Sequence, residues 1–209
     1  MIFYDCATAP SPRRARMVLA EKGLTPEVRQ IDLRAGENLS PAFLAVNPRG
    51  TVPVLVTDEG TVLTENLGIA AYLEARFPQV PLLGRNPDET GLVWMWTAIA
   101  EQQGGAPMAE ALRNGSPAMK DRALPGPVPY AQIPELAERG RARVARFFDL
   151  LDDRLRHSPW LALDAFSLAD LTAYVFVDYC RVIRMRPADG QAALRDWMAR
   201  IAARPSAQA

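Results

Sequence analysis

The chain has 209 residues, 49% of them hydrophobic, and its 24 basic residues balance its 24 acidic ones. A net charge of zero argues against a general affinity for nucleic acid or for an anionic membrane surface. The single histidine, His157, argues against a histidine-rich metal site, and the two distant cysteines, Cys6 and Cys180, form no disulfide framework or metal-ligand spacing, so no metal site is predicted.

Targeting signals are missing from the sequence pattern. The first residues, MIFYDC, read as a strand without a basic leader, and no apolar run reaches the length of a membrane span. We therefore expect a cytoplasmic protein that does not associate with a membrane. All basic residues except Lys22 and Lys120 are arginine, a bias that is typical of a GC-rich bacterial genome.

The first 32 residues predict a strand, a helix and a second strand. Met1 to Asp5 is a short buried strand, and a helix follows that ends at Gly23. Ser11 and Pro12 suit the N-cap and first helical positions of that helix. The second strand spans residues 27 to 32, with Val28 and Ile31 as its apolar members, and Arg13, Arg14 and Arg16 are expected on a solvated helix face.

A proline interrupts the next strand pattern. After a short helix near residues 40–44, Thr51 to Val56 has strand-forming residues around Pro53, and a turn at 58–60 leads to a strand at 61–63. A helix is then predicted from Glu65 to Phe77. Because proline cannot donate to a strand ladder, Pro53 indicates either a sheet edge or a cis bond at a ligand site.

The stretch from Asn47 to Leu73 carries a family resemblance. It contains N-P-x-G-x-V-P-x-L, a short hairpin, and then L-T-E-N-x-x-I-x-x-Y-L. This pattern resembles the glutathione-binding half of the cytosolic glutathione S-transferases, and the likeness extends over nearly the whole chain. It implies an α/β plus all-α fold: a thioredoxin-like domain at residues 1–79, a proline-rich linker at 80–88 and an all-helical domain at 89–209.

The resemblance also assigns roles around Pro53. It implies that Pro53 is cis and that the Val52 backbone pairs with the cysteinyl part of glutathione. Glu65 and Asn66 would hold the γ-glutamyl end, although the family more often has serine at the second of these positions. The glycyl carboxylate needs a cation or an amide, for which the nearby loops offer Arg34, Asn38 and Arg49.

Activation of the thiol needs a donor near the first helix. A free thiol with a pKa of about 8.5 is mostly protonated at neutral pH, and a hydroxyl at a helix N-terminus favours the thiolate. Ser11 aligns with the family position that acts on the thiol, unless its oxygen only caps the helix. Thr8 is the alternative, and Cys6 is a third candidate that more simply packs in the core.

Beyond the linker the pattern is helical. Residues 89–103 predict a helix that breaks or kinks at Gly104, Gly105 and Pro107, and residues 114–130 predict irregular chain. A long amphipathic helix follows from Ile133 to His157. We expect the second substrate between the domains, with Trp96 and Tyr130 as lining residues.

The last part of the chain contains a helix start signal. Ser167 suits an N-cap and Asp170, three residues later, can complete a capping box, so Asp170 is predicted to be structural. The helix that begins there continues to Ile183 and should lie in the core of its domain. A final helix is predicted for residues 192–203.

These features predict a glutathione transferase that joins glutathione to a small hydrophobic electrophile. Glutathione is a co-substrate and no further cofactor is predicted. Peroxide or disulfide side activity is compatible with the site, and the family resemblance implies a homodimer that functions in detoxification. The alternative is a non-catalytic glutathione-binding or scaffold protein on the same fold. A thioredoxin-like reductase is disfavoured because the chain has no C-x-x-C pair.

Overall fold

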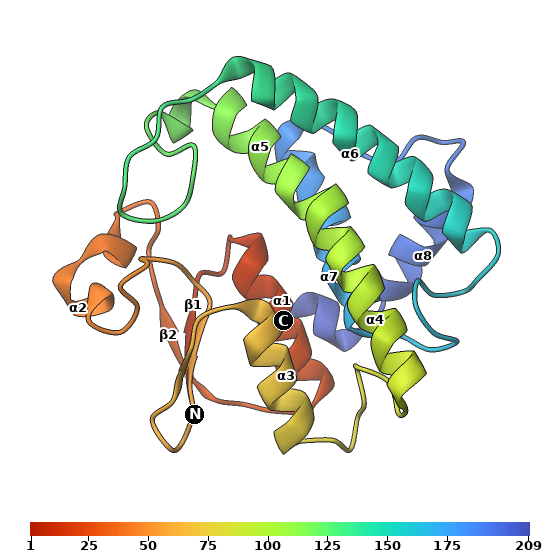
Figure 1. Ribbon diagram of the computed structural model, residues 1–209, viewed down its shortest axis with the longest axis horizontal. Helices are drawn as coiled ribbons and strands as arrows, with labels where there is room; N and C mark the ends of the chain where they lie inside the picture. The colour runs from red at the N-terminus through yellow and green to blue at the C-terminus, as the bar shows by residue number, and fades with distance from the viewer. The chain divides into compact units, whose positions relative to one another are not determined.

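The computed structural model describes all 209 residues, which divide into two compact units (Figure 1). Unit 1 comprises Met1–Val80, Leu124–Pro129 and Ala209, and unit 2 comprises Pro81–Ala123 and Tyr130–Gln208. The segment 124–129 is therefore separated in sequence from the rest of unit 1 by part of unit 2.

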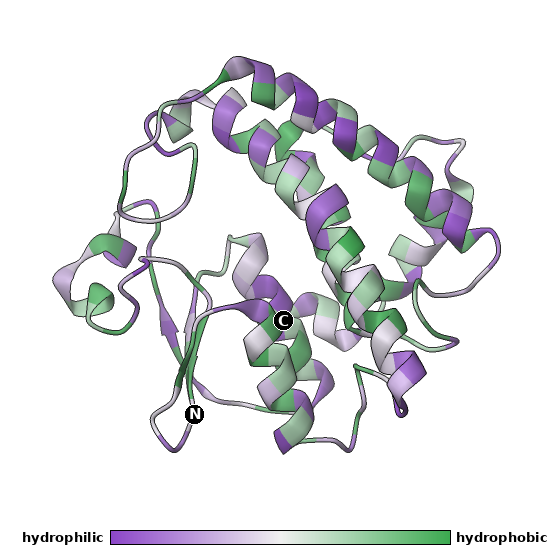
Figure 2. Ribbon diagram, viewed as in Figure 1, coloured by the Kyte–Doolittle hydropathy of each residue, from purple (hydrophilic) through white to green (hydrophobic).

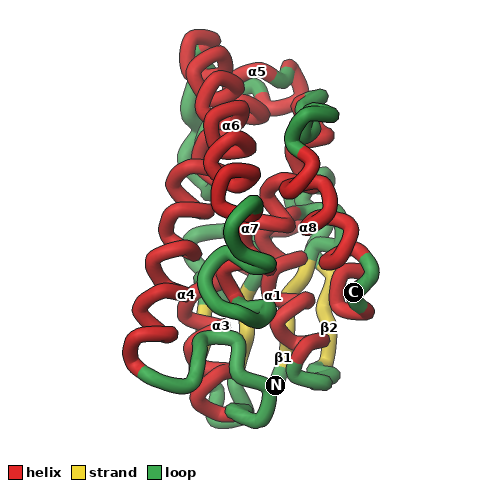
Figure 3. The backbone as a smooth tube through the Cα atoms, turned by 90° about the vertical axis from the view of Figure 1, so that its right-hand side faces the viewer, coloured by secondary structure: helices red, strands yellow, loops and turns green.

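Unit 1 is a four-stranded sheet with helices, in the order of a thioredoxin-like domain. The strands are β1 (Ile2–Asp5), β2 (Glu27–Gln30), β3 (Val54–Val56) and β4 (Val62–Leu63), in the spatial order β2-β1-β3-β4. β1 is parallel to β2 and antiparallel to β3, and β3 is antiparallel to β4. The helices are α1 (Pro10–Glu21), α2 (Pro41–Leu44) and α3 (Asn66–Arg76). Figure 3 shows the strands in yellow, and all of them belong to this unit.

Two strand predictions need correction. The second strand ends at Gln30, and all four of its residues are exposed because β2 is the edge of the sheet. Val28 is 52% exposed, while Ile31 is buried but lies beyond the strand. The proline-containing strand begins only at Val54, since Pro53 has no amide hydrogen to donate to the ladder.

Unit 2 is helical. Its helices are α4 (Pro87–Ile99), α5 (Ala106–Gly115), α6 (Pro134–Leu155), α7 (Leu168–Tyr179) and α8 (Ala192–Ala202). α6 buries one apolar stripe and exposes charged residues elsewhere, as its alternating colours in Figure 2 show. No helix of the protein combines the length and apolarity that crossing a membrane requires.

The predicted break or kink near Gly104 takes the form of a π-helical interruption, without a break in the helical path. A π-helical stretch, Ala100–Gly105, joins α4 to α5, so the chain follows one helical path (Figure 1). A Cβ on Gly104 would lie 2.4 Å from a ring carbon of Phe147, and one on Gly105 would lie 2.5 Å from Phe176. The two glycines thus allow close contact with aromatic rings, and the wider π turn accommodates Pro107 within the helical path.

The capping box at the start of α7 is confirmed. The amide and hydroxyl of Ser167 both donate to Asp170 Oδ2, at 3.1 and 2.8 Å. Asp170 Oδ1 also accepts from the Leu161 amide at 2.9 Å and from Trp197 Nε1 at 3.0 Å. Burial raises the pKa of Asp170, and these four hydrogen bonds oppose that effect. Asp170 therefore connects three segments of unit 2 and acts in its architecture.

Candidate functional site

The Val52–Pro53 peptide bond is cis, as predicted. The Val52 side chain is buried in a cluster with Tyr4, Phe43 and Val54. Its backbone amide and carbonyl make no hydrogen bond within the protein. Buried backbone groups rarely stay without a partner, so these two are available to an extended peptide ligand.

The N-terminus of α3 lies next along the chain. Glu65 is its N-cap residue, and no side chain caps the helix. The first intrahelical bond runs from the Ile69 amide to the Glu65 carbonyl, which leaves the first-turn amides of residues 66–68 unpaired. Free amides at the positive end of a helix dipole form a site that suits a carboxylate.

Arg49 and Glu65 line one cavity. Arg49 Nη2 lies 2.9 Å from Glu65 Oε1 and also donates to Thr64 Oγ1. The cavity has a volume of about 410 Å³, and its other lining residues are Pro48, Thr51, Pro125, Gly126 and Pro127. All of these residues belong to unit 1, so the proline-rich segment 124–129 contributes a wall of the candidate site.

Ser11 is not the N-cap of α1, contrary to the prediction. The helix begins one residue earlier, at Pro10, and Ala9 is its N-cap, without a side-chain cap. Ser11 is the second helical residue, and its Oγ accepts a hydrogen bond from Asn66 Nδ2 at 2.8 Å. Asn66 is itself buried, and its Oδ1 has no partner in the protein. The fold thus connects two predicted site residues that are 55 positions apart in sequence.

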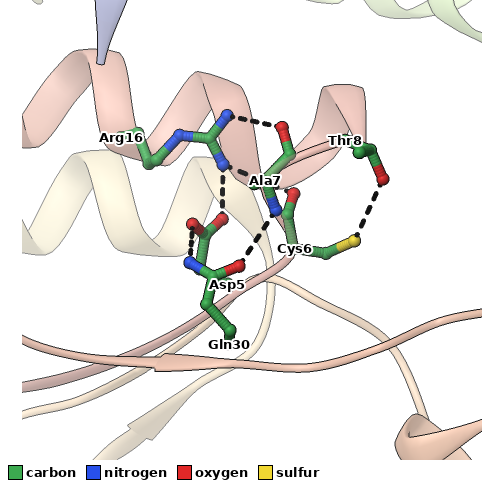
Figure 4. A network of polar contacts seen from close by, with 6 residues as sticks. All are labelled: Asp5, Cys6, Ala7, Thr8, Arg16 and Gln30. Carbon is green, nitrogen blue, oxygen red and sulfur yellow. Dashed lines mark hydrogen bonds and ion pairs between the residues drawn. The ribbon is translucent and has the colours of Figure 1, made fainter.

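The loop between β1 and α1 is held by a polar network, drawn in Figure 4. Arg16 pairs with the buried Asp5 at 2.5 Å and donates to the carbonyls of Cys6 and Ala7. Gln30 donates to Asp5 at 2.6 Å and accepts from the Ala7 amide at 3.1 Å. These contacts fix the direction in which the loop presents its side chains.

The expected solvated arginine face of α1 is wrong for two of its three members. Arg14 is buried, and Arg16 pairs with Asp5 in the network just described. A buried carboxylate without a partner would be costly, and the long side chain of Arg16 reaches from α1 to Asp5 at the end of β1. The arginine side chains of α1 were expected in solvent because they are charged. The sequence does not reveal which face of α1 lies against the buried Asp5 carboxylate.

The other two candidates for thiol chemistry lie close together. Cys6 Sγ and Thr8 Oγ1 are 3.6 Å apart, and Figure 4 shows them on the same loop. Thr8 is exposed, whereas Cys6 is buried directly after β1. Thr8 remains an alternative hydroxyl donor, and Cys6 contributes to the core cluster of unit 1.

Asn38 has a structural contact. Its Nδ2 donates to the Gly50 carbonyl at 2.8 Å, while its Oδ1 is buried without a partner. The amide hydrogen that faces Gly50 is not available to a ligand, so this contact supports the loop before Thr51. Binding of the glycyl carboxylate by Asn38 or Arg49 stays a prediction.

The predicted lining residues of the second-substrate pocket both belong to unit 2. The Arg154 guanidinium lies 5.6 Å from the ring centre of Trp96. Tyr130 has an exposed side chain, and its backbone amide and carbonyl bond to Asp121 and Ala123. Their role toward a second substrate stays a prediction.

Sequence reasoning missed two parts of the site. It treated segment 124–129 as irregular chain, although three of its residues line the Arg49–Glu65 cavity. It also missed the hydrogen bond between Asn66 and Ser11, because nothing local in sequence indicates a partner so distant. No group of three or more His, Cys, Asp or Glu side chains is placed to hold a metal ion.

Comparison with known families agrees with this geometry. Residues 8–76 match the N-terminal domain model of glutathione S-transferases, and residues 116–205 match the C-terminal domain model. The chain therefore belongs to the glutathione S-transferase family.

Individual relatives are similar over most of their length. Glutathione S-transferase 2 of Saccharomyces cerevisiae is 34% identical, across 99% of this chain and 87% of the relative. The crystal structure of Gtt2 from Saccharomyces cerevisiae has a TM-score of 0.90 at 33% identity, covering 100% of this chain and 99% of that one. The disulfide-bond oxidoreductase YfcG of Escherichia coli is 28% identical, across 93% of this chain and 95% of YfcG.

Proposed function

We propose that this protein binds glutathione in unit 1 and transfers it, through its sulfur, to a small hydrophobic electrophile. The observation that carries the proposal is the unpaired backbone of Val52 beside cis-Pro53, together with the uncapped N-terminus of α3, whose N-cap residue Glu65 lines one cavity with Thr51. Glutathione is a peptide with an ammonium and a carboxylate at its γ-glutamyl end. These protein groups are complementary to that chemistry.

Each part of glutathione has a partner in the proposal. The Val52 backbone pairs with the cysteinyl residue, and the first-turn amides of α3 receive the γ-glutamyl carboxylate. Glu65, held by Arg49, receives the ammonium group. Arg49 and Asn38 remain the candidates for the glycyl carboxylate.

Ser11 supplies the donor to the sulfur, and Thr8 is the alternative. Ser11 lies in the first turn of α1, where the helix dipole also favours an anion. Lowering the thiol pKa by one unit requires about 1.4 kcal/mol, which is within the range of one charge-assisted hydrogen bond. Trp96 and Tyr130 are the proposed apolar contacts of the electrophile.

Calorimetric titration of glutathione into the wild type and into Glu65→Ala tests the binding site. We expect binding by the wild type and an affinity at least tenfold weaker for the variant, since the ammonium loses its carboxylate. No binding by the wild type would refute the proposal. A panel of electrophiles then separates a transferase from the alternative, a non-catalytic binding or scaffold protein, which would bind glutathione without turnover of any member.

A second activity, reduction of disulfides or peroxides, has one supporting observation. The chain is similar to a disulfide-bond oxidoreductase of Escherichia coli. Reduction of a mixed disulfide substrate by glutathione would use the same thiolate. If the activity depends on Cys6 as a protein thiol, Cys6→Ala abolishes it; if it depends only on bound glutathione, Cys6→Ala retains it.

The localisation, the origin, the oligomeric state and the biological role of the protein are also part of the proposal. We infer a cytoplasmic, bacterial homodimer that acts in detoxification, as the family resemblance and arginine-rich composition suggested. Light scattering at micromolar protein concentration tests the dimer, and a monomeric mass would contradict it.

A further inference from the structure

In the hydrogen bond between Asn66 and Ser11, asparagine is the donor and serine is the acceptor. Asn66 Nδ2 and Ser11 Oγ are 2.8 Å apart. A serine hydroxyl has one hydrogen, so an oxygen that accepts from Asn66 keeps that hydrogen for another partner. No backbone amide of α1 donates a capping hydrogen bond to Ser11 Oγ. The hydroxyl hydrogen of Ser11 is therefore directed away from Asn66 and remains available to a ligand.

The carbonyl oxygen of the Asn66 carboxamide has no hydrogen-bond partner. Asn66 is only 8% exposed, and its Oδ1 makes no hydrogen bond in the protein. A buried carbonyl oxygen without a partner costs free energy, which a bound donor would recover. Asn66 is the first residue of α3, where the proposed γ-glutamyl site lies, and the γ-glutamyl ammonium is a donor of the required kind.

We propose that Asn66 is a positioning residue that couples the amino end of glutathione to its sulfur. Its Oδ1 accepts from the γ-glutamyl ammonium, and its Nδ2 holds Ser11 so that the hydroxyl donates to the glutathione sulfur. The thiol proton leaves to solvent, and the thiolate that remains accepts the Ser11 hydrogen. This inference rests on the proposed glutathione binding.

Polarisation of the Ser11 hydroxyl by Asn66 strengthens its hydrogen bond to the sulfur. A hydroxyl that accepts a hydrogen bond becomes a better donor, because hydrogen bonds in a chain polarise one another. The amide, hydroxyl and thiolate form such a chain. The family more often has serine at position 66, whose side chain is one bond shorter than that of asparagine. Such a side chain would bind a ligand at the α3 N-terminus but would not reach Ser11 in the same way.

The nearby charges are the same in every variant of the test. Before Asn66 in sequence these are Glu65 with its partner Arg49, and after Ser11 on α1 they are Arg13, Arg14 and Arg16, the last of which pairs with Asp5. The substitution Asn66→Ser changes no charge, so a shift in the thiol pKa reports the hydrogen-bond chain. Thr61→Ala is the matched control, since it removes an exposed hydroxyl of unit 1 that neither lines the Arg49–Glu65 cavity nor bonds to Asn66 or Ser11.

The experiment measures the pKa of the enzyme-bound glutathione thiol from the ultraviolet absorbance of the thiolate across a pH series. The proteins are the wild type, Asn66→Ser, Ser11→Ala, the double variant and Thr61→Ala. We expect Asn66→Ser and Ser11→Ala each to raise the thiol pKa by about one unit, a tenfold loss of thiolate below the pKa. The double variant should show no further shift, and Thr61→Ala should match the wild type.

Calorimetry at a pH where the thiol is protonated separates binding from positioning. We expect the affinity of Asn66→Ser to stay within about threefold of the wild type, because serine retains a polar group at the α3 N-terminus. Thermal unfolding checks that all variants are folded. An unchanged thiol pKa in Asn66→Ser, or additive shifts in the double variant, would overturn this inference while leaving glutathione binding intact. Absence of glutathione binding in the wild type would overturn both proposals.

Discussion

Arg49 forms an ion pair with Glu65 at the N-terminus of α3. Arg49 Nη2 and Glu65 Oε1 are 2.9 Å apart, and both side chains are more than half exposed. An exposed ion pair contributes about 1 kcal/mol or less to stability, so the pair is a weak explanation of the fold. Its position in the cavity lined by Thr51 and Gly126 gives it another use. It fixes the direction of the one carboxylate that can meet a bound ammonium there.

Replacing Arg49 should therefore affect binding more than stability. We expect Arg49→Ala to leave the melting temperature within a few degrees of the wild type and to weaken glutathione binding about tenfold. Calorimetry and thermal unfolding measure the two effects. Arg195→Ala, which removes a similarly exposed pair with Asp189, is the control and should change neither quantity. Equal affinity in Arg49→Ala and the wild type would contradict this role.

Gly126 brings the 124–129 segment against the site. Its φ is +110°, and a Cβ there would lie 3.3 Å from the Arg49 carbonyl oxygen. An alanine in this backbone region is strained by about 1–2 kcal/mol, so Gly126→Ala should displace the segment and raise the Kd for glutathione. Gly190→Ala, at a position with open space and no positive φ, should bind as the wild type does. Identical binding constants for all three proteins would show that the segment is not part of the site.

The glycines of the α4–α5 helical path provide a matched pair. Gly105→Ala would place a Cβ 2.5 Å from the Phe176 ring, whereas Gly91→Ala, in α4, meets nothing within 4 Å. We expect Gly105→Ala to destabilise the protein by about 1–3 kcal/mol through overpacking. Gly91→Ala should stabilise it by up to about 1 kcal/mol, because alanine has the higher helix propensity. Denaturant unfolding distinguishes these opposite signs, and two changes of the same sign would contradict the packing argument.

Cys180 should be chemically inert in the folded protein. Burial raises the pKa of its thiol from the ordinary value of 9.0 to about 12. At pH 8 about one molecule in ten thousand carries the thiolate, so alkylation should label Cys180 only after unfolding. Mass spectrometry of alkylated peptides measures this, and rapid labelling of Cys180 in the folded state would contradict the burial.

The same pKa shift predicts the direction in which the free energy of unfolding changes with pH. Above pH 9 the unfolded chain releases the Cys180 proton while the folded chain keeps it until about pH 12. The folded state then binds more protons, so the contribution of Cys180 to the free energy of unfolding falls as pH rises through that interval. Denaturant titrations of wild type and Cys180→Ala between pH 8 and 10.5 should show a steeper decline in the wild type, and parallel declines would refute the assignment.

The sequence by itself determined the features that depend on neighbouring residues. A proline inside a strand pattern indicated a sheet edge or a cis bond at Val52–Pro53, and the family resemblance implied the cis bond that is observed. Serine followed three residues later by aspartate indicated the α7 capping box. Caps, turns and proline effects act within a few positions of the chain, so their residues identify them. The family pattern around Glu65 and Asn66 extended this to the candidate site.

Only the tertiary structure decided which distant groups meet. It paired Asn66 with Ser11, turned Arg16 from the expected solvated face to buried Asp5, and placed Gly126 against Arg49. It also showed that the expected break or kink is a π-helical stretch, in which Gly104 and Gly105 leave room for the rings of Phe147 and Phe176. Such contacts depend on how elements pack and on which way each side chain points, and neither follows from local spacing.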